Sequence, residues 1–392
     1  MTKIEQTELL VAGGGPVGLF AALCASRRGL DVVVIERNFR GAPRGHTTLL
    51  HPSSLRLLAE LGLAPLLLHS GKLIEEIQVR AQAGTKRLAL PFPALAITQR
   101  VFEETLLKAL RQSEVDIRST CEVTAVEPRE TQVEVGVARR ERVDAPRALD
   151  DERWELLESG SIHAQFVIGA DGRTSRVRQA LGIGTATGPV ERYAMFEFPT
   201  ATSVDTELII AGRFCHAITP LFDDRARCSF QLDPTSTQPA DLPLLRASLA
   251  ELVPSRAAPQ EFDWGHIVDF EPTVAEAFGR GRVCLAGDAA HSTSPLGVQS
   301  MNRGLLEVYQ WVEEMAACNA GKHSLTTLEL LAGAQRRDWL GTLGSSANYE
   351  SLPHAAHWLA GHENRVVSAL PVSGPDVEAL LHQLGFARRL AT

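Results

Sequence analysis

Apolar and polar positions form a regular succession near the N-terminus. An apolar run at 9–12 enters a glycine-rich turn, and the apolar segment at 19–23 that follows has the composition of a buried helix. A second apolar run at 32–35 ends in Glu36. A strand, a tight turn, a helix and a second strand in this order are typical of a parallel sheet. The pattern therefore predicts a βαβ unit over residues 9–36.

Strand and helix patterns alternate along the rest of the chain. The charged run 138–156 carries both signs, which favours a solvated surface hairpin. Periodicity and turn residues predict further strands at 116–126, 132–137, 164–168 and 283–286, a hairpin at 73–90, and helices at 52–61, 101–112, 175–181, 305–318, 325–340 and 375–388. Between the strands at 164–168 and 283–286, alternating segments at 193–198, 207–210, 214–220 and 227–232 predict an inserted antiparallel sheet.

The glycine-rich turn carries the first candidate chemistry. Gly13, Gly15 and Gly18 have GxGxxG spacing, in which the first glycine permits the turn, the second lets a pyrophosphate approach, and the third lets helix and strand pack closely. The phosphates would lie at the positive end of the helix. Glu36 stands where an acidic side chain binds a ribose hydroxyl. The strand before and the helix after complete a dinucleotide fingerprint.

Composition narrows the possible partners. A chain of 392 residues exceeds one typical core, so we expect two domains. The net charge is −8 and no long basic stripe is present, which argues against a nucleic-acid partner. No apolar run approaches the ~20 residues that cross a bilayer, and the N-terminus has no secretory pattern. We expect a soluble cytoplasmic protein without a membrane partner, as a monomer or homodimer.

The six cysteines are scattered, with no C-x-x-C pair and no cluster with histidine. Cys24 and Cys284 lie in apolar surroundings and are interpreted as core residues. We predict neither a disulfide framework nor a metal site.

Three separated motifs carry a family resemblance: GGGPVG with Glu36 and Arg37, GADGRTSRVR around Asp171, and GRVCLAGDAAHSTSPLG around Asp288. Together they resemble the FAD-dependent aromatic hydroxylases of the para-hydroxybenzoate hydroxylase type, which are single-component flavoprotein monooxygenases. The likeness spans residues 8 to about 340.

The resemblance implies an α/β fold: a Rossmann-like FAD-binding domain with an inserted antiparallel-sheet substrate domain and a helical C-terminal region. The expected boundaries are 1–72, 96–185 and 278–320 for the discontinuous FAD-binding domain, 73–95 and 186–277 for the substrate-binding sheet domain, and 321–392 for the C-terminal helical region.

The resemblance also assigns residues to the cofactor. Gly13, Gly15, Pro16, Gly18 and Glu36 would hold the ADP half of FAD, with Arg37 by the adenosine and Arg44 and Gln99 near the pyrophosphate and flavin. Asp171 is associated with FAD and reduced nicotinamide, and Asp288 with the ribityl chain. The loop from Pro295, Gly297 and Val298 to Met301 and Asn302 would follow the isoalloxazine edge.

The implied reaction uses NAD(P)H and molecular oxygen to hydroxylate or epoxidise a small aromatic or polyketide-like metabolite. The chemistry is centred on the flavin, so no catalytic side chain is assigned. His216, Arg213, Phe222 and Tyr193 are candidates for the substrate pocket, although each is more often a packing or surface residue. The sequence does not choose between NADH and NADPH.

One departure from the family pattern keeps alternatives open. Many members continue the third motif as PxGGQGxNxGxxDAxNL, whereas here Val298 and Ser300 replace glycines and Glu307 replaces the aspartate. A β-branched residue does not readily adopt positive φ, so we expect a different placement or mobility of the flavin. The alternatives are an FAD-binding cyclase or isomerase without net redox turnover, a flavin dehydrogenase or reductase, and a non-enzymatic interaction module.

Overall fold

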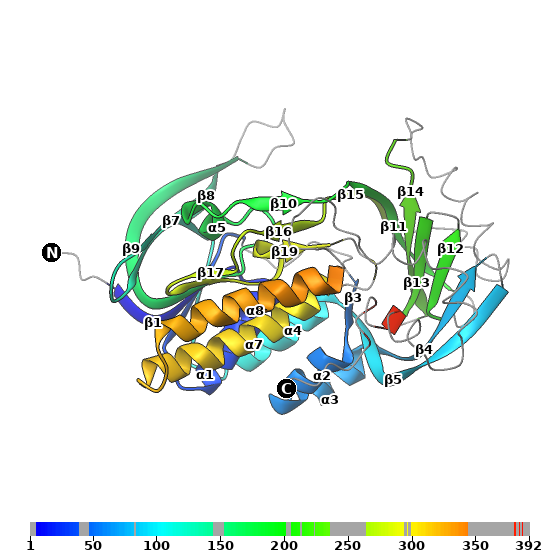
Figure 1. Cartoon of the computed structure of the whole chain (residues 1–392), viewed down its shortest axis with the longest axis horizontal. Coiled ribbons are helices and arrows are strands. Elements are labelled where there is room, and N and C mark those ends of the chain that lie inside the picture. The colour runs from blue at the N-terminus through cyan, green and yellow to red at the C-terminus, as the bar shows by residue number, and fades with distance from the viewer. Residues whose placement is uncertain are drawn as a thin grey trace.

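The computed structural model describes residues 5–38, 47–81, 84–143, 153–200, 205–211, 214–222, 224–235, 264–293, 296, 299–343, 380–381, 384 and 386. Two large sheets lie side by side, and a group of long helices covers one face of the first (Figure 1). Among the described helices, none is both long enough and apolar enough to cross a bilayer.

The first sheet contains the predicted βαβ unit. Its main path follows the order β17-β18-β9-β1-β2-β6, and the hairpin of β7 and β8 is attached to it through β9. The strands are β1 (Glu5–Ala12), β2 (Val32–Glu36), β6 (Asp116–Ser119), β7 (Cys121–Pro128), β8 (Val133–Val143), β9 (Arg153–Gly169), β17 (Gly279–Arg280) and β18 (Val283–Leu285). The five strands from β18 to β6 form four pairs, all parallel, as a βαβ origin requires.

Helix α1 (Pro16–Arg27) lies at the centre of the covering layer. Its residues 17–25 are all buried, because the helix packs between the sheet, α4 (Gln99–Leu110) and α7 (Gln299–Asn319). Helix α8 (Leu325–Leu343) lies alongside α7 (Figure 1). A Cβ atom at Gly18 would lie 1.9 Å from the carbonyl oxygen of Gly13, so only glycine allows this close approach of helix and turn.

The second sheet follows the order β15-β11-β14-β13-β12-β4-β5-β3. It consists of β3 (Thr47–Leu50), β4 (Lys72–Ala81), β5 (Gly84–Thr98), β11 (Glu191–Pro199), β12 (Glu207–Ala211), β13 (Phe214–Leu221), β14 (Arg225–Leu232) and β15 (Trp264–Phe270). The expected antiparallel pairing is confirmed except at one junction, where β12 pairs with β4 in parallel. No tight turn connects these two strands, so none imposes an antiparallel pairing.

Shorter elements connect the two sheets. They are α2 (Pro52–Glu60), α3 (Ala64–Ser70), α5 (Arg176–Ala180), the short helix η1 (Gly287–Ala289) and a three-stranded sheet of β10 (Thr185–Thr187), β16 (Thr273–Ala275) and β19 (His291–Ser292). Strand β3 pairs with β5 in the second sheet, although it precedes residue 73. The division into domains stays a prediction.

Helix α7 begins at Gln299, earlier than the predicted start at Leu305. Gly304 made the segment before residue 305 resemble a loop, because glycine weakens a helix interior. The structure explains this glycine: a Cβ atom there would lie 2.9 Å from the Cα of Gly287, where α7 crosses the Asp288 turn. Of the predicted helix at 375–388, the described residues are 380, 381, 384 and 386, and the rest lies outside the described part of the chain.

Candidate cofactor and substrate site

The glycine turn after β1 is shaped by backbone contacts. Gly13 has φ of +109°, and a Cβ atom there would lie 2.2 Å from the carbonyl oxygen of Ala170. Gly15 differs, because a Cβ atom there would meet nothing within 4 Å. Gly15 caps α1, and the following Pro16 occupies the first turn of the helix. The turn therefore presents open space at the N-terminus of a buried helix, where anions are favoured.

A cavity of about 190 Å³ lies on one side of this turn, and we call it the adenosine-side cavity. Glu36 and Arg37 line it together with Asp171. One oxygen of the Glu36 carboxylate accepts a hydrogen bond from the backbone N–H of Gly14 at 2.5 Å, and the other accepts one from Asn38 N–H at 2.7 Å. A carboxylate has about four acceptor sites, so Glu36 keeps capacity for the hydroxyls of a ribose.

Asp171 has one occupied and one available oxygen. Its Oδ2 accepts hydrogen bonds from the backbone N–H groups of Arg176 at 2.6 Å and Val177 at 3.1 Å. Its Oδ1 is buried and has no hydrogen-bond partner among the described residues. Buried acceptors are almost always satisfied in folded proteins. The carboxylate therefore fits a position where a hydrogen-bond donor of a bound molecule completes the site.

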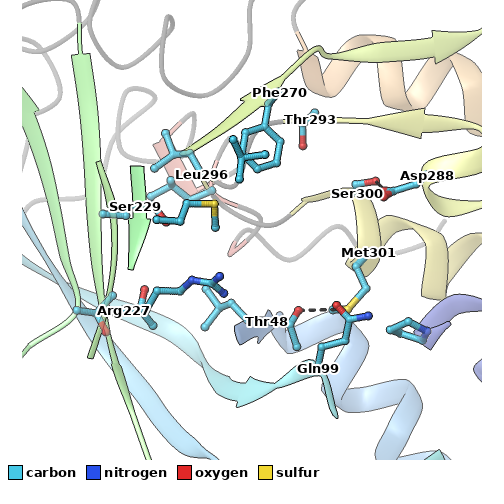
Figure 2. Close-up of a pocket in the computed structure, with 18 of the residues that line it drawn as sticks. Thr48, Gln99, Arg227, Ser229, Phe270, Asp288, Thr293, Leu296, Ser300 and Met301 are labelled. Carbon is cyan, nitrogen blue, oxygen red and sulfur yellow. Dashed lines mark hydrogen bonds between the residues drawn. The ribbon is translucent and has the colours of Figure 1, made fainter. Parts of the chain in front are cut away.

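A larger cavity of about 530 Å³ lies between the two sheets, and we call it the central cavity. Gly15, Ala170 and Gly172 line both cavities, so the two meet at the glycine turn. Figure 2 shows Asp288, Ser300, Met301 and Gln99 on one side of the central cavity and Arg227 and Ser229 on the other. The same turn therefore borders both cavities, with Glu36 in the wall of one and the second sheet in the wall of the other.

Two predicted cofactor residues hold the wall of the central cavity on the helical side. Gln99 lies in the first turn of α4, and its Nε2 donates a hydrogen bond to Glu103 Oε1 at 2.7 Å. The Met301 sulfur accepts a hydrogen bond from Thr48 Oγ1 at 3.2 Å (Figure 2). Both side chains line the cavity, and their contact with a cofactor stays a prediction.

The Asp288 turn is attached to α7 through Ser300. The Ser300 hydroxyl contacts Asp288 Oδ1 and, at 2.9 Å, the carbonyl oxygen of His291. Ser300 lies in the first turn of α7 and has no positive φ, so this position does not need the freedom of a glycine. The departure from the family pattern therefore supplies an additional polar contact to Asp288.

A buried carboxylate makes the second attachment. Glu307 accepts hydrogen bonds from His291 Nε2 at 2.7 Å and from the backbone N–H of Gly287 at 3.3 Å. His291 is fully buried, and its ring stacks on Trp339 with centroids 3.8 Å apart. Glu307 thus contacts both ends of the short helix that carries Asp288. We call Ser300, Glu307 and His291 the α7 brace.

Asn302 makes several contacts within the protein. Its Oδ1 accepts hydrogen bonds from His51 N–H at 2.8 Å and from the Ser54 hydroxyl at 2.7 Å, and its Nδ2 donates one to the Leu49 carbonyl at 2.7 Å. The buried side chain joins α7 to the connection between β3 and α2. Its predicted role in cofactor binding is untested.

Four predicted site residues are not described by the structure: Arg44, Pro295, Gly297 and Val298. Arg37 is exposed beside the adenosine-side cavity, and its carbonyl oxygen accepts a hydrogen bond from Arg140 at 3.3 Å.

Three of the four candidates for the substrate pocket are described by the structure, and none of these three lines the central cavity. His216 is buried against Phe230, with the rings stacked at 4.2 Å, and burial lowers the pKa of this histidine to about 4. The Tyr193 hydroxyl donates a hydrogen bond to Glu191 at 3.1 Å, and Phe222 is exposed. Arg213 lies outside the described residues.

No motif in the sequence pointed to Arg227, which points from β14 into the central cavity (Figure 2). It is 6% exposed, and burial lowers its pKa to about 10, partly offset by the charge of Glu197. The strand register places Glu197 opposite Arg227. Arg227 is the one cationic side chain among the described residues of the cavity wall.

The described residues fit FAD. The adenosine-side cavity would take the adenosine end and the central cavity the flavin end, and Gly15, which lines both, leaves room for phosphates between them. The orphaned Asp171 oxygen and the Glu36 carboxylate supply acceptors at the adenosine end. The N-terminus of α1 supplies positive electrostatic potential between the two ends.

Comparisons with known proteins agree with this geometry. A family model described as the FAD binding domain matches residues 6–330, and the chain therefore belongs to this family. The expectation of an FAD-dependent fold of the aromatic hydroxylase type is confirmed, and so is FAD as the cofactor.

The relatives are monooxygenases. The chain is 28% identical over 339 residues to a flavin-dependent monooxygenase of Mycobacteroides abscessus, covering 79% of this chain and 67% of the relative. It is 27% identical over 330 residues to 6-methylpretetramide 4-monooxygenase of Streptomyces rimosus, covering 80% of this chain and 56% of the relative. The chain thus spans little more than half the length of the second relative.

A solved structure of p-nitrophenol 4-monooxygenase from Pseudomonas putida has the same fold. Its TM-score is 0.76 at 20% sequence identity, and the alignment covers 99% of this chain and 100% of the other. The expectation of a flavin monooxygenase agrees with these relatives, whereas the cyclase alternative is not favoured by them.

Proposed function

We propose that this protein is an FAD-dependent monooxygenase that hydroxylates or epoxidises a small aromatic or polyketide-like molecule, with NAD(P)H as electron donor. FAD, when bound, accepts a hydride from the nicotinamide and activates molecular oxygen. The observation that carries the proposal is that the glycine turn borders both cavities, since Gly15, Ala170 and Gly172 line each of them. A cofactor held at the adenosine side extends toward the cavity wall formed by the second sheet.

The lining of the central cavity supports an aromatic substrate. The second sheet supplies Met195, Leu208, Val268 and Phe270, which form an apolar wall. The polar groups on this side are Thr206, Glu207, Thr219, Arg227 and Ser229. Ligand sites commonly combine such apolar walls with a small number of polar groups that fix orientation. A flat, mostly apolar ring with one or two oxygen substituents satisfies both features.

The same wall supports the oxygenation chemistry. Apolar side chains exclude water from the reacting centre, and exclusion of water limits the loss of reactive intermediates. The protein residues in this proposal bind, orient and shield. The Asp288 turn and its α7 brace hold the cofactor side, while the second sheet holds the substrate side.

The curated relatives carry monooxygenase names, and nothing in the described residues specifically favours a dehydrogenase or an isomerase. The sequence-based predictions of a cytoplasmic location and of a monomer or homodimer stay predictions.

Isotope labelling tests the proposal. The purified protein, loaded with FAD, is mixed with NADH or NADPH under ¹⁸O₂ and offered para-nitrophenol and a polycyclic aromatic polyketide as probes. We expect faster nicotinamide oxidation with a productive probe and a product heavier by one ¹⁸O atom. A parallel reaction in H₂¹⁸O with ordinary oxygen controls for exchange. A product of unchanged mass that forms without nicotinamide would contradict oxygenation and support isomerisation.

A further inference from the structure

The C-terminal part of the chain contributes to the central cavity. Leu384 and Phe386 line it, whereas all the other lining residues lie between positions 15 and 301. In Figure 1 the short red segment at 380–381 lies beside β13, β4 and β5 of the second sheet. The cavity wall is therefore completed by residues that follow α8 in the chain.

Packing fixes these two side chains. Leu384 and Phe386 are each 4% exposed and belong to one apolar cluster with Leu380, which is fully buried. Backbone hydrogen bonds hold the segment, from Leu384 N–H to the Leu380 carbonyl at 2.9 Å and from Phe386 N–H to the Leu381 carbonyl at 2.7 Å. Their positions are thus determined by the cluster and by local backbone bonds.

The cluster joins the segment to both sides of the cavity. It includes Leu49 and Ile77 of the second sheet and Leu296, which follows the Asp288 turn, and all three also line the cavity. The Phe386 ring packs against His51, with centroids 5.7 Å apart. The backbone N–H of His51 in turn bonds Asn302 of α7. Leu384 and Phe386 therefore lie at the junction of the sheet that faces the substrate and the helix that carries the brace.

These residues lie beyond the part of the chain that the family model matches, which ends at residue 330. The cofactor half of the cavity is built within the matched part, whereas this section of wall is an addition to it. Because both side chains are large, apolar and buried at the cavity surface, they occupy volume that a substrate would otherwise use.

We propose that Leu384 and Phe386 are specificity-determining residues that set the size of the aromatic substrate. The inference rests on the proposed function for its substrate class. A hydrophobic pocket discriminates between ligands by the volume it offers, with about tenfold or more for each added or removed small apolar group. Removing the Phe386 ring therefore opens room for a longer substituent and removes contacts from a small ligand.

Ligand binding without turnover tests the inference. The full-length protein, loaded with oxidised FAD and without nicotinamide, is titrated with phenol, 4-ethylphenol, 4-butylphenol and 4-phenylphenol, and the flavin absorbance reports binding. We expect Phe386→Ala to bind 4-phenylphenol about tenfold more tightly relative to phenol than the wild type does. We expect Leu384→Ala to change the ratio in the same direction by a smaller factor.

Leu380→Ala is the matched control, because Leu380 belongs to the same cluster and does not line the cavity. It should lower thermal stability as much as Leu384→Ala and leave the ratio of phenol affinities unchanged. An equal ratio in the wild type, Phe386→Ala and Leu384→Ala would overturn the inference, and so would the absence of phenol binding in all variants. Size-dependent binding without ¹⁸O incorporation would instead contradict the proposed function and leave the role of Leu384 and Phe386 standing.

Discussion

The adenosine-side cavity and the substrate wall of the central cavity are constructed differently. At the adenosine end, backbone atoms approach one another so closely that a single Cβ atom at Gly13 or Gly18 would lie about 2 Å from a carbonyl oxygen. At the second sheet, the wall consists of side chains that alternate along paired strands, such as Met195 opposite Ser229. The glycine turn depends on the absence of side chains, whereas the substrate wall depends on which side chains are present.

This difference predicts how each end responds to substitution. A side chain added at the glycine turn would collide with neighbouring atoms, except at Gly15, where it would enter the space proposed for the ligand. Apolar substitutions on a strand face change the size of the cavity while leaving the ladder hydrogen bonds intact. A fold with this construction keeps one cofactor while its substrate wall varies.

The largest effect is expected from Gly15→Val. The backbone at Gly15 has φ of −77°, which valine can adopt, and the side chain would enter the open space between the cavities. FAD affinity should fall by more than about a hundredfold, roughly 2.8 kcal/mol, while the apoprotein unfolds near the wild-type temperature. Titration of apoprotein with FAD and calorimetry of the apoprotein measure the two quantities. Tight FAD binding by this variant would place the pyrophosphate elsewhere.

The second sheet should be the acid-sensitive part, because of His216. Its pKa is lowered to about 4 by burial, whereas an unfolded histidine has a pKa near ~6.5. Between these values the unfolded chain binds a proton that the folded chain does not, so the free energy of unfolding falls as the pH falls from 6.5 to 4. The free energy of unfolding is unaffected by His216 above pH ~6.5, and protonation of the unfolded chain lowers it by at most about 3 kcal/mol as the pH falls to 4.

His216→Asn is the control for this prediction, since an amide oxygen can accept the hydrogen bond that Gln231 N–H donates to His216 Nδ1 at 3.1 Å. Urea unfolding at pH 7.5 and 4.5 should show a smaller pH dependence in the variant than in the wild type. Equal pH dependence in both proteins would assign the acid sensitivity to other groups.

At the adenosine end, Glu36→Ala should weaken FAD binding by about ten- to a hundredfold, which corresponds to charge-assisted hydrogen bonds of roughly 1.5–3 kcal/mol. The structure adds a second cause, because Glu36 also accepts the hydrogen bond from Gly14 N–H in the turn. Glu36→Gln keeps an acceptor for Gly14 and loses the charge, so it should show the smaller loss. Unchanged affinity in Glu36→Ala would exclude Glu36 from the cofactor site.

The smallest effect is expected from restoring the family residues in the α7 brace. Glu307→Asp shortens the carboxylate by one methylene, so it should not reach both His291 and Gly287. Ser300→Gly removes the hydroxyl from Asp288. Each should weaken FAD binding by about three- to tenfold, the value of one hydrogen bond. The flavin reduction potential should also shift in Glu307→Asp. An unchanged affinity and potential in both variants would show that the brace does not act on the cofactor.

The sequence predicted the βαβ unit and its glycine turn well, because local backbone requirements are visible in the local sequence. The glycines at 13, 15 and 18, the Asp-Gly turn at Asp171 and the turn at Asp288 each follow a strand within a few residues. Their geometry does not depend on distant pairing. The start of α7 was predicted late, since Gly304 serves a contact with Gly287 that only the folded chain reveals.

The substrate end could not be predicted in the same way. His216 and Ala217 are neighbours in sequence, yet of the two only Ala217 lines the cavity. The face that each residue occupies depends on a register that the sequence alone did not determine. Leu384 and Phe386 depend on packing against strands that lie hundreds of positions earlier, for which no local pattern exists.

The parallel junction between β12 and β4 also constrains the order in which the chain can fold. The hairpin of β4 and β5 is complete by Thr98, but the edge that β4 presents has no partner until Glu207–Ala211 has been synthesised. A contact separated by so many residues forms slowly, because closing a long loop costs entropy before the pairing compensates for it. During synthesis the nascent hairpin therefore exposes an unpaired edge and the apolar residues Ile77 and Val79. Until β12 is available, that edge can pair with another chain, so a chaperone that shields it would favour correct folding.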